Sequence, residues 1–327
     1  MKPASLLVPA LAAALLTSPS AAQEATPPAE NLPPVEAGET ILLETDTWER
    51  MTVPVSIGGR GPYRFVVDTG AERTVIAREV ARDLQLDAGR KARVHSMTEV
   101  RDVATVVIPK LEMGDRHVKA IHAPALAQHH LGAEGMLGVD ALRSQRVSFD
   151  FDREEMVVEP SSRREDRWTR DSIVVTARSR FGRLVLVDAS VDGEKVWVII
   201  DTGSQVTVGN SALRARLERK GRIGTVRRIE LLSVTGGRME ADQAVTRRIR
   251  IGGMDIRQMP VAFADVHPFR KLDLMDRPAL LLGMDALQSF KHVSVDFANR
   301  QVRLLARPRA DVRPEAQLAG AGARPVS

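Results

Sequence analysis

The sequence predicts a mainly β protein folded as two similar lobes. Its 327 residues are 43% hydrophobic and 27% charged, which is typical of a globular protein long enough for two domains. Three segments occur twice, in the same order: "VVDTGAERTVI" matches "IIDTGSQVTVG", "LEMGDRHVKAI" matches "IRIGGMDIRQM", and "GMLGVDALRSQRVSFDFDREEMVV" matches "LLLGMDALQSFKHVSVDFANRQVRL". The spacing between these segments differs between the copies, so we expect one unit repeated with altered loops.

The repeat sets the expected domain boundaries. Residues 39–160 form the N-terminal lobe and residues 171–306 the C-terminal lobe, and the polar residues 161–170 link them. Residues 23–38 and 307–327 are rich in Pro and Ala and lack periodicity. We therefore expect a flexible lead-in before the first lobe and a disordered tail after the second.

Each copy reads as short strands with one clear helix. "MTVPVSIGG" and "LVLVDASVDGE" alternate apolar and polar residues, end in Gly-containing turns, and lead into an apolar run. The predicted helices are "VDALRS" and "MDALQS" near the end of each copy. Asp140 and Asp285 fall early in these helices, where a negative charge interacts favourably with the helix dipole.

The first 22 residues are typical of an export signal. Lys2 precedes an apolar run from Leu6 to Leu16, and the small residues that end at Ala22 suit cleavage. That run is shorter than the roughly 20 apolar residues that span a bilayer. We expect a periplasmic or secreted protein without a stable membrane anchor.

Composition excludes several classes of function. The chain has no cysteine, so it holds no disulfide, thiol nucleophile or lipoprotein anchor. Arginines such as those in Thr246–Ile251 alternate with apolar residues and aromatic content is only 4%, which argues against nucleic-acid binding. Five of the seven histidines lie between His95 and His130, but their spacing does not match the common zinc patterns. We expect no metal and no other cofactor.

The Asp-Thr-Gly tripeptides are the candidate functional motif. A single copy is explained by a strand that ends in a turn, because Asp accepts backbone hydrogen bonds and Gly takes a positive φ. Here Asp68–Gly70 and Asp201–Gly203 each follow an apolar run, and each precedes an apolar-apolar-Gly-x-Asp-Ala-Leu block. The pair of motifs, with matching blocks downstream, indicates a site built from two carboxylates.

These residues resemble the retropepsin and pepsin clan of aspartic proteases, and "DTGAERTVI" is especially similar to the active-site loop of retroviral proteases. The resemblance covers both lobes. It implies two retropepsin-like β-barrel lobes that form a pseudo-dimer with a cleft between them. It also implies that Met136–Gly138 and Leu281–Gly283 pack behind the two loops. A retropepsin has one such loop per chain and must dimerise, whereas this chain supplies two, so we expect a monomer.

The chemistry agrees with the resemblance. Peptide hydrolysis without a metal or a covalent nucleophile needs one group that takes a proton from water and one that protonates the carbonyl oxygen. Two adjacent carboxylates share one proton and supply both groups, and the aspartic proteases are themselves the standard case. Asp68 and Asp201 would be this pair. The family pattern implies supporting roles for five more residues: Thr69, Gly70, Thr202, Gly203 and Ser204.

The two loops differ directly after the motif. Ala71 follows in the first lobe and Ser204 in the second. A hydrogen bond from the Ser204 hydroxyl would favour the ionised form of Asp201. The hypothesis is that Asp201 is the base and Asp68 the proton donor.

Two segments are candidates for flaps over the cleft. They are "SMTEVRDV" (Ser96–Val103) and "SVTGGRME" (Ser233–Glu240), and only the second has the Gly-Gly of a retropepsin flap tip. The first is explained equally well by an ordinary surface hairpin. The residues expected to contact substrate are Ala71, Thr235, Gly236 and Gly237.

Three functions remain open. The leading one is an aspartic endopeptidase, a hydrolase of peptide or protein substrates. The first alternative is a catalytically silent protease-like scaffold that binds peptides or envelope ligands, and the second is a module that pairs with another chain. Four apolar residues expected near the cleft favour apolar substrate side chains: Val75, Ile76, Val206 and Val208.

Overall fold

A computed structural model describes residues 39–42, 44–45, 51–114, 116–161, 172–180, 183–186, 188–307 and 324–325. Gly38–Ser327 form one compact unit, which therefore includes both lobes. The predicted export signal, the lead-in and all but the first residue of the predicted linker lie outside the described residues. Within the described part of the chain, no helix has the length and apolar character needed to cross a membrane.

The first lobe is a closed six-stranded β-barrel. Its strands are β3 (Met51–Ile57), β4 (Arg60–Val67), β10 (Gly135–Leu137), β5 (Val75–Ala77), β9 (Arg116–Leu126) and β8 (Thr105–Met113), in their spatial order. Pairing of Ile57 with Leu111 joins β3 to β8 and closes the barrel. Alternate residues of β3, such as Val53 and Val55, face the core and are almost fully buried, as a period of two requires.

The second lobe repeats this order of strands. They are β14 (Arg183–Leu186), β17 (Trp197–Ile200), β22 (Ala279–Leu282), β18 (Val208–Gly209), β21 (Met254–Phe263), β20 (Arg238–Ile251), β15 (Ala189–Val191) and β16 (Glu194–Lys195). The pairing Val185↔Ile199 repeats Thr52↔Val66 of the first lobe. Together β14 and β15 occupy the place of β3, so the predicted fold class is confirmed in both lobes.

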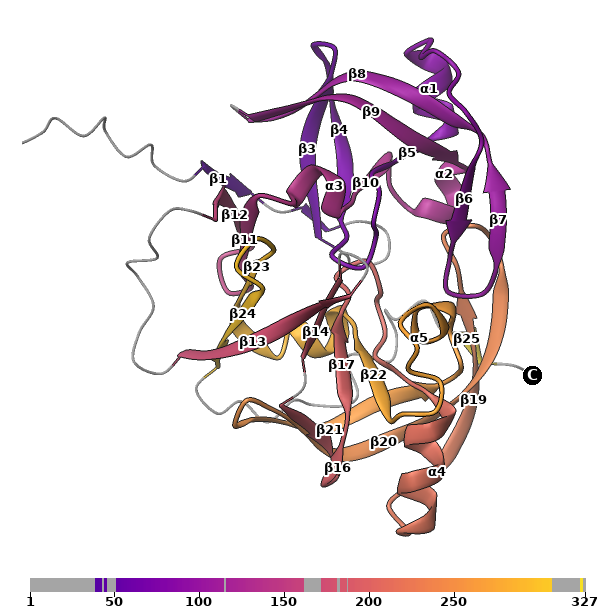
Figure 1. The fold of residues 1–327 in the computed structure, drawn as a ribbon, viewed down its shortest axis with the longest axis vertical. Coiled ribbons are helices and arrows are strands. Elements are labelled where there is room, and N and C mark those ends of the chain that lie inside the picture. The colour runs from indigo at the N-terminus through magenta and orange to yellow at the C-terminus, as the bar shows by residue number, and fades with distance from the viewer. Residues whose placement is uncertain are drawn as a thin grey trace, which may run out of the picture. The chain divides into compact units, whose positions relative to one another are not determined.

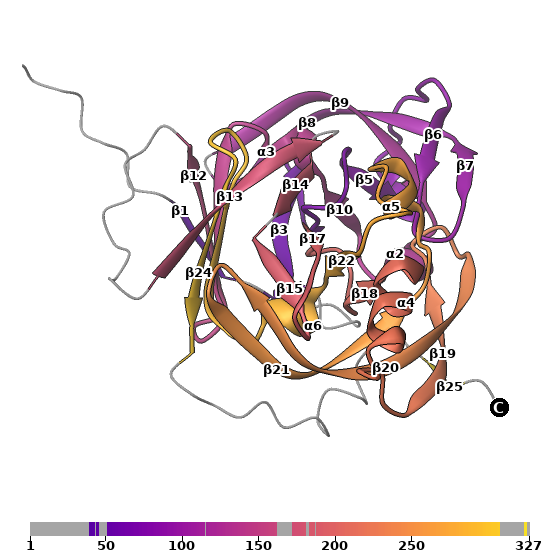
Figure 2. The same cartoon turned by 60° about the horizontal axis from the view of Figure 1, so that its bottom comes forward.

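Six strands join the lobes in one stretch of sheet. Their order is β1 (Glu39–Leu42), β12 (Glu155–Pro160), β11 (Gln145–Asp150), β23 (Phe290–Asp296), β24 (Gln301–Ala306) and β13 (Ser172–Arg180). The stretch continues into the second lobe, because β13 also pairs with β14. Strands β11 and β23 come from different lobes and pair antiparallel, with Ser148 opposite Ser294 and their hydroxyls 2.9 Å apart. In Figures 1 and 2 this sheet lies on the side away from hairpin β6–β7.

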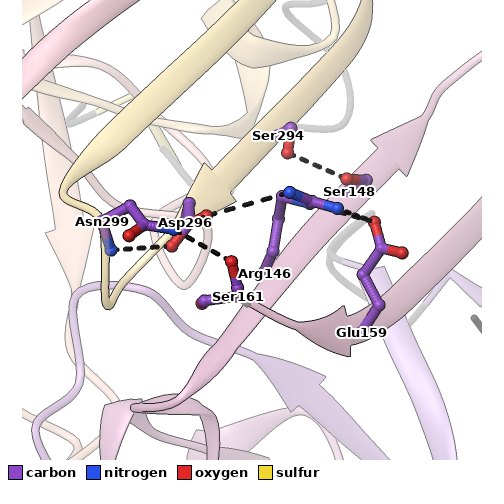
Figure 3. Close-up of polar contacts among 7 residues, drawn as sticks. All are labelled: Arg146, Ser148, Glu159, Ser161, Ser294, Asp296 and Asn299. Carbon is purple, nitrogen blue, oxygen red and sulfur yellow. Dashed lines mark hydrogen bonds and ion pairs between the residues drawn. The ribbon is translucent and has the colours of Figure 1, made fainter. Parts of the chain in front are cut away.

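Buried polar contacts reinforce this junction (Figure 3). The Arg146 side chain on β11 is 5% exposed and lies 2.6 Å from Glu159 Oε1 and 4.0 Å from Asp296 Oδ2. The side-chain amide of Asn299 donates to Asp296 and to the carbonyl of Ser161. Burial of a charge is unfavourable unless the charge is paired, so these contacts make the position of Arg146 dependent on both lobes.

The helices lie outside the barrels, and there are more of them than predicted. The expected α3 (Val139–Leu142) and α6 (Met284–Leu287) are present. The structure adds α1 (Arg78–Asp83), α2 (Gln128–Leu131), α4 (Ser211–Arg219) and α5 (His267–Lys271). Nine-residue α4 begins after Asn210, whose side chain accepts the Leu213 N–H as an N-cap does.

The remaining strands are short or belong to hairpins. They are β2 (Glu44–Thr45), β6 (Ala92–His95), β7 (Val100–Val103), β19 (Val226–Leu232) and β25 (Arg324–Pro325). Strand β25 lies within the segment predicted to be a disordered tail, and it pairs with β19. The edge of β19 opposite β20 offers backbone groups for this pairing.

Candidate active site

The two Asp-Thr-Gly loops begin where a buried strand of each barrel ends. Strand β4 ends at Val67 and runs parallel to β10, and the Asp68 N–H donates to the carbonyl of Leu137 at 3.0 Å. In the second lobe β17 runs parallel to β22, and the Asp201 N–H donates to Leu282 at 3.1 Å. The "MLG" and "LLG" segments therefore lie behind the loops, as expected.

The glycines of the motif let the two loops approach each other. A Cβ atom placed on Gly70 would lie 2.5 Å from Cγ of Asp201, and one on Gly203 would lie 2.3 Å from Cγ of Asp68. No side chain fits at these distances. Each loop backbone thus packs against the carboxylate of the other lobe, and both aspartates are buried, with exposed fractions of 8% and 7%.

The threonines lock the loops together. The Thr69 N–H donates to Thr202 Oγ1 at 3.0 Å, and the Thr202 N–H donates to Thr69 Oγ1 at 3.2 Å. The hydroxyls in turn donate to carbonyls of the opposite lobe, Thr69 to Ile200 at 3.0 Å and Thr202 to Val67 at 2.6 Å. These bonds cross between the lobes, and they fix one aspartate relative to the other.

The donors around the carboxylates differ from the expectation for Ser204. The Ser204 hydroxyl donates to the carbonyl of Val206 at 2.8 Å, a local side chain to backbone bond, so the predicted bond to Asp201 is absent. Oδ1 of Asp68 accepts the N–H groups of Gly70 at 2.7 Å and Ala71 at 2.9 Å. Oδ1 of Asp201 accepts the Gly203 N–H at 3.1 Å. Asp68 therefore accepts two loop amides and Asp201 accepts one.

The Gly-x-Asp-Ala-Leu blocks hold the loops from behind. The carboxylate of Asp140 accepts the N–H and the hydroxyl of Thr74, both at 2.8 Å. Asp285 accepts the same two groups of Thr207, at 2.9 and 2.7 Å. Burial raises the pKa of Asp285 to about 7, although the donors of Thr207 and Ala286 oppose this shift. Both aspartates thus do more than the dipole role predicted from the sequence.

A cavity of about 220 Å³ lies over the loops and contains both catalytic candidates in its lining. Gly70, Ala71, Gly203 and Ser204 also line it. Two of the four apolar residues predicted near the cleft, Val75 and Val206, line the cavity.

The other two, Ile76 and Val208, are fully buried and face the core, so they do not line it. Val75 and Ile76 are neighbours in β5, and neighbouring side chains of a strand point to opposite faces, which explains their difference. Val206 precedes β18, whereas Val208 is its first residue.

Two hairpins cover the cavity from opposite lobes. The turn of β6–β7 with the start of β7, Ser96–Arg101 ("SMTEVR"), corresponds to the turn of β19–β20 with the start of β20, Ser233–Arg238 ("SVTGGR"). Ser96 and Met97 of the first and Ser233 and Val234 of the second line the cavity. The turns of both hairpins therefore line the cavity, and the two hairpins are named the first flap and the second flap.

The flap tips contact each other. The Thr235 hydroxyl lies 3.0 Å from both Ser96 Oγ and Glu99 Oε1. A Cβ atom on Gly237 would lie 2.2 Å from Thr98 Oγ1, so the backbone of the second flap lies directly on the first. Thr235, Gly236 and Gly237 were predicted to contact substrate, but in this structure they face the opposite lobe and do not line the cavity.

Several cavity residues were not predicted. Glu72 Oε1 and Lys271 Nζ form an ion pair at 2.5 Å that crosses from the first loop to α5. His95 and His130 also line the cavity. Helix α5 belongs to a stretch that is longer in the second copy, so the repeat gave no signal for Lys271. Among the described residues, no group of three or more His, Cys, Asp or Glu side chains is arranged to hold a metal ion.

Two β lobes that each place an Asp-Thr-Gly loop at one flap-covered cavity define the class of two-lobed acid-protease folds. A family model described as aspartyl protease matches residues 53–141 and 187–286, one region in each lobe and more than half of the chain. The chain belongs to the aspartyl protease family. No curated protein matches its sequence.

Proposed function

We propose that this protein is an aspartic endopeptidase in which Asp68 and Asp201 act together on one water molecule. The observation that carries the proposal is the reciprocal packing of each Asp-Thr-Gly loop against the carboxylate of the other lobe. Membership of the aspartyl protease family supports hydrolysis of peptide bonds. We expect the two carboxylates to share one proton, as in other aspartic proteases, because neighbouring carboxylates do not both ionise.

The hydrogen bonds support one assignment of roles. Asp68 accepts two loop amides and is the ionised partner, which takes a proton from the attacking water. Asp201 is the protonated partner, which donates to the carbonyl oxygen of the scissile bond. This order is opposite to the one expected from Ser204, because the Ser204 hydroxyl is engaged by Val206.

The cavity supports an extended peptide as substrate. It runs between the loops and the flaps, and its walls include apolar side chains from both lobes, among them Val75, Met136, Val206 and Leu231. We expect apolar residues next to the cut bond. Digestion of a peptide library would test this, and a lack of apolar enrichment around the cleavage sites would contradict it.

The cellular setting follows from the sequence. The apolar run from Leu6 to Leu16 supports export to the periplasm or the medium. Because one chain supplies both aspartates, the active form is a monomer without a cofactor. A single species of monomer mass in sedimentation would agree, and a stable dimer would favour the interaction-module alternative.

Cleavage of a denatured protein from pH 3 to 8 tests the activity, with wild type, Asp201→Asn and the exposed control Asp276→Asn in parallel. We expect wild type and the control to cut in acid and Asp201→Asn not to cut. If Asp201→Asn cuts as well as wild type, the two loops are not one dyad. If none of the three cuts at any pH, the silent scaffold becomes the better explanation.

A further inference from the structure

The first flap is held to the second lobe by a pair of histidines. His95 ends β6, and its Nδ1 lies 3.1 Å from Nε2 of His267, the first residue of α5. Their ring centroids are 4.5 Å apart. The N–H of His267 also donates to the carbonyl of Met97 in the flap turn, at 2.9 Å. The flap is therefore fixed at a side-chain contact and a backbone contact that are two residues apart.

The second flap is also contacted by a histidine of the opposite lobe. A Cβ on Gly236 would lie 2.3 Å from Cε1 of His130, in α2. His130 and His267 are not equivalent in the repeat, because Ile76 pairs with Ala125 whereas its counterpart Gly209 pairs with Phe263. His130 follows Ala125 by five residues and His267 follows Phe263 by four, so each lobe contacts the opposite flap from a similar but not identical position.

Protonation changes the contact between His95 and His267. Two neutral imidazoles, or one neutral and one charged ring, form an N–H···N hydrogen bond, with the donor set by the tautomer. Two charged rings have no acceptor nitrogen and repel each other. The closed flap therefore holds at most one proton on this pair, whereas separated rings bind two.

The surrounding charges also oppose a second proton. Arg93 on β6, Arg73 in the first loop and Lys271 on α5 line the same cavity as His95. Three nearby acidic groups are already paired: Glu72 with Lys271, Glu99 with Arg101, and Asp102 with Arg93. The other acidic groups in the cavity lining are Asp68 and Asp201, which under the proposed function carry one negative charge between them. Arg270 adds a further positive charge on the exposed side of α5.

We propose that His95 and His267 form a proton-operated clasp, which positions the first flap over Asp68 and Asp201 and releases it in acid. Separated imidazoles titrate near their ordinary value of about 6.5, so opening takes up about one proton below that pH. The ratio of open to closed flap then rises by up to about tenfold for each pH unit below this value. Under the proposed function, on which its catalytic meaning rests, the clasp would couple substrate access to the acidic conditions in which the dyad works.

Spin labels can measure this opening without any catalysis. The chain has no cysteine, so Val100→Cys on the flap and Arg219→Cys on α4 can be labelled specifically. Both positions are exposed. We expect the distance distribution between the labels to be closed at pH 7.5 and to shift to longer distances at pH 5.0.

Two substitutions of His267 distinguish flap opening caused by protonation of the histidine pair from other effects of low pH on the protein. His267→Gln places a neutral amide where Nε2 lies, so it keeps the hydrogen bond but cannot become a second cation, and its flap should stay closed at both pH values. His267→Ala removes the bond, so its flap should be open at both, with His95→Ala as a second route to the same state. His122→Ala, at an exposed histidine of β9, should behave as wild type.

The outcomes are distinct. An unchanged wild-type distance between pH 7.5 and 5.0, a His267→Gln flap that opens as wild type does, or alanine variants that stay closed would each overturn the clasp. None of these results depends on peptide cleavage. A cleaving enzyme with a pH-independent flap would therefore refute the clasp alone, and an inactive protein with a switching flap would refute only the protease assignment.

Discussion

The two lobes are most alike around the Asp-Thr-Gly loops and differ at their edges. The Thr–Thr bonds between the loops are reciprocal and the Thr–Asp contacts behind them occur in both lobes, although Asp68 accepts two loop amides and Asp201 one. Away from the cavity, the second lobe replaces β3 by two shorter strands and lengthens its peripheral helix to nine residues, against six in α1. The two lobes of the chain are therefore most similar in structure where Asp68 and Asp201 meet.

The two flaps differ in the side chains that hold them to the opposite lobe. His95 of the first flap corresponds to Leu232 of the second, so only one side has a pair of histidines. At the other side His130 lies near positive charges, and burial followed by the charges of His129 and Arg101 lowers its pKa. In a symmetric dimer the two flaps have the same sequence, so a pair of histidines at one flap must also occur at the other. In a single chain with two lobes, the two flaps can differ, so a histidine pair can hold one flap and not the other.

The largest effect is expected where the lobes are most alike. Gly70→Ala and Gly203→Ala each push a methyl group into the opposite carboxylate, so both should lose about 100-fold or more in kcat/KM. Gly224→Ala is the matched control, since no atom lies within 4 Å of its Cβ position. If one of the two loop variants kept full activity, the lobes would not contribute equally to the site.

The next effect concerns the junction. Removal of the Arg146 side chain takes a buried positive charge away from Glu159 and Asp296, so Arg146→Ala should lower the free energy of unfolding by about 3 kcal/mol. Urea denaturation measures the change. Arg93→Ala removes an ion pair whose side chains are 68% and 57% exposed and should leave stability unchanged. Equal stability of the two variants would show that the buried cluster does not hold the lobes.

A smaller effect distinguishes the flap threonines. Thr235 and Thr98 occupy the same repeat position, but only the Thr235 hydroxyl bonds to the other flap, while Thr98 Oγ1 is buried without a hydrogen-bond partner among the described residues. Thr235→Val should cost about 1 kcal/mol, which corresponds to several-fold faster amide exchange in both flaps. Thr98→Val should leave exchange unchanged or slow it. If Thr98→Val accelerated amide exchange more than Thr235→Val does, the hydrogen bonds of the Thr235 hydroxyl would not stabilise the flaps.

The smallest effect is a pH dependence at the other end of β11 and β23. There His292 lies opposite Asp150, and burial lowers its pKa although Asp150 opposes the shift. The folded protein therefore holds His292 neutral while the unfolded chain gains a proton as the pH falls through about 6.5, so stability drops from pH 7.5 to 5.5. Urea titrations should show a weaker drop for His292→Asn than for wild type. His117→Asn, at an exposed histidine, should keep the wild-type slope.

The repeat made most of the site predictable. It placed both aspartates, the threonines, the glycines and the segments behind the loops, because each of these follows from a local pattern seen twice. Helix α4 was missed although its signal was present, since Asn210 before a run of good helix formers is an N-cap pattern.

Contacts between distant residues could not be predicted in this way. His95 and His267 are 172 residues apart, and the Arg146 cluster joins three strands. Ser204 was misassigned because a hydroxyl beside an aspartate has several acceptors within reach, and only the backbone geometry selects Val206. Sequence patterns identified which residues matter, and tertiary packing decided what each one bonds.

The inter-lobe sheet has a consequence for behaviour on dilution. Strands β1, β11 and β12 come from one half of the chain and β13, β23 and β24 from the other, so the sheet is in effect a subunit interface inside one polypeptide. The tether between the halves fixes their effective concentration at a value that does not depend on how much protein is present. The site therefore stays assembled at concentrations where an enzyme made of two separate chains would fall apart, and its specific activity should not decline as it is diluted.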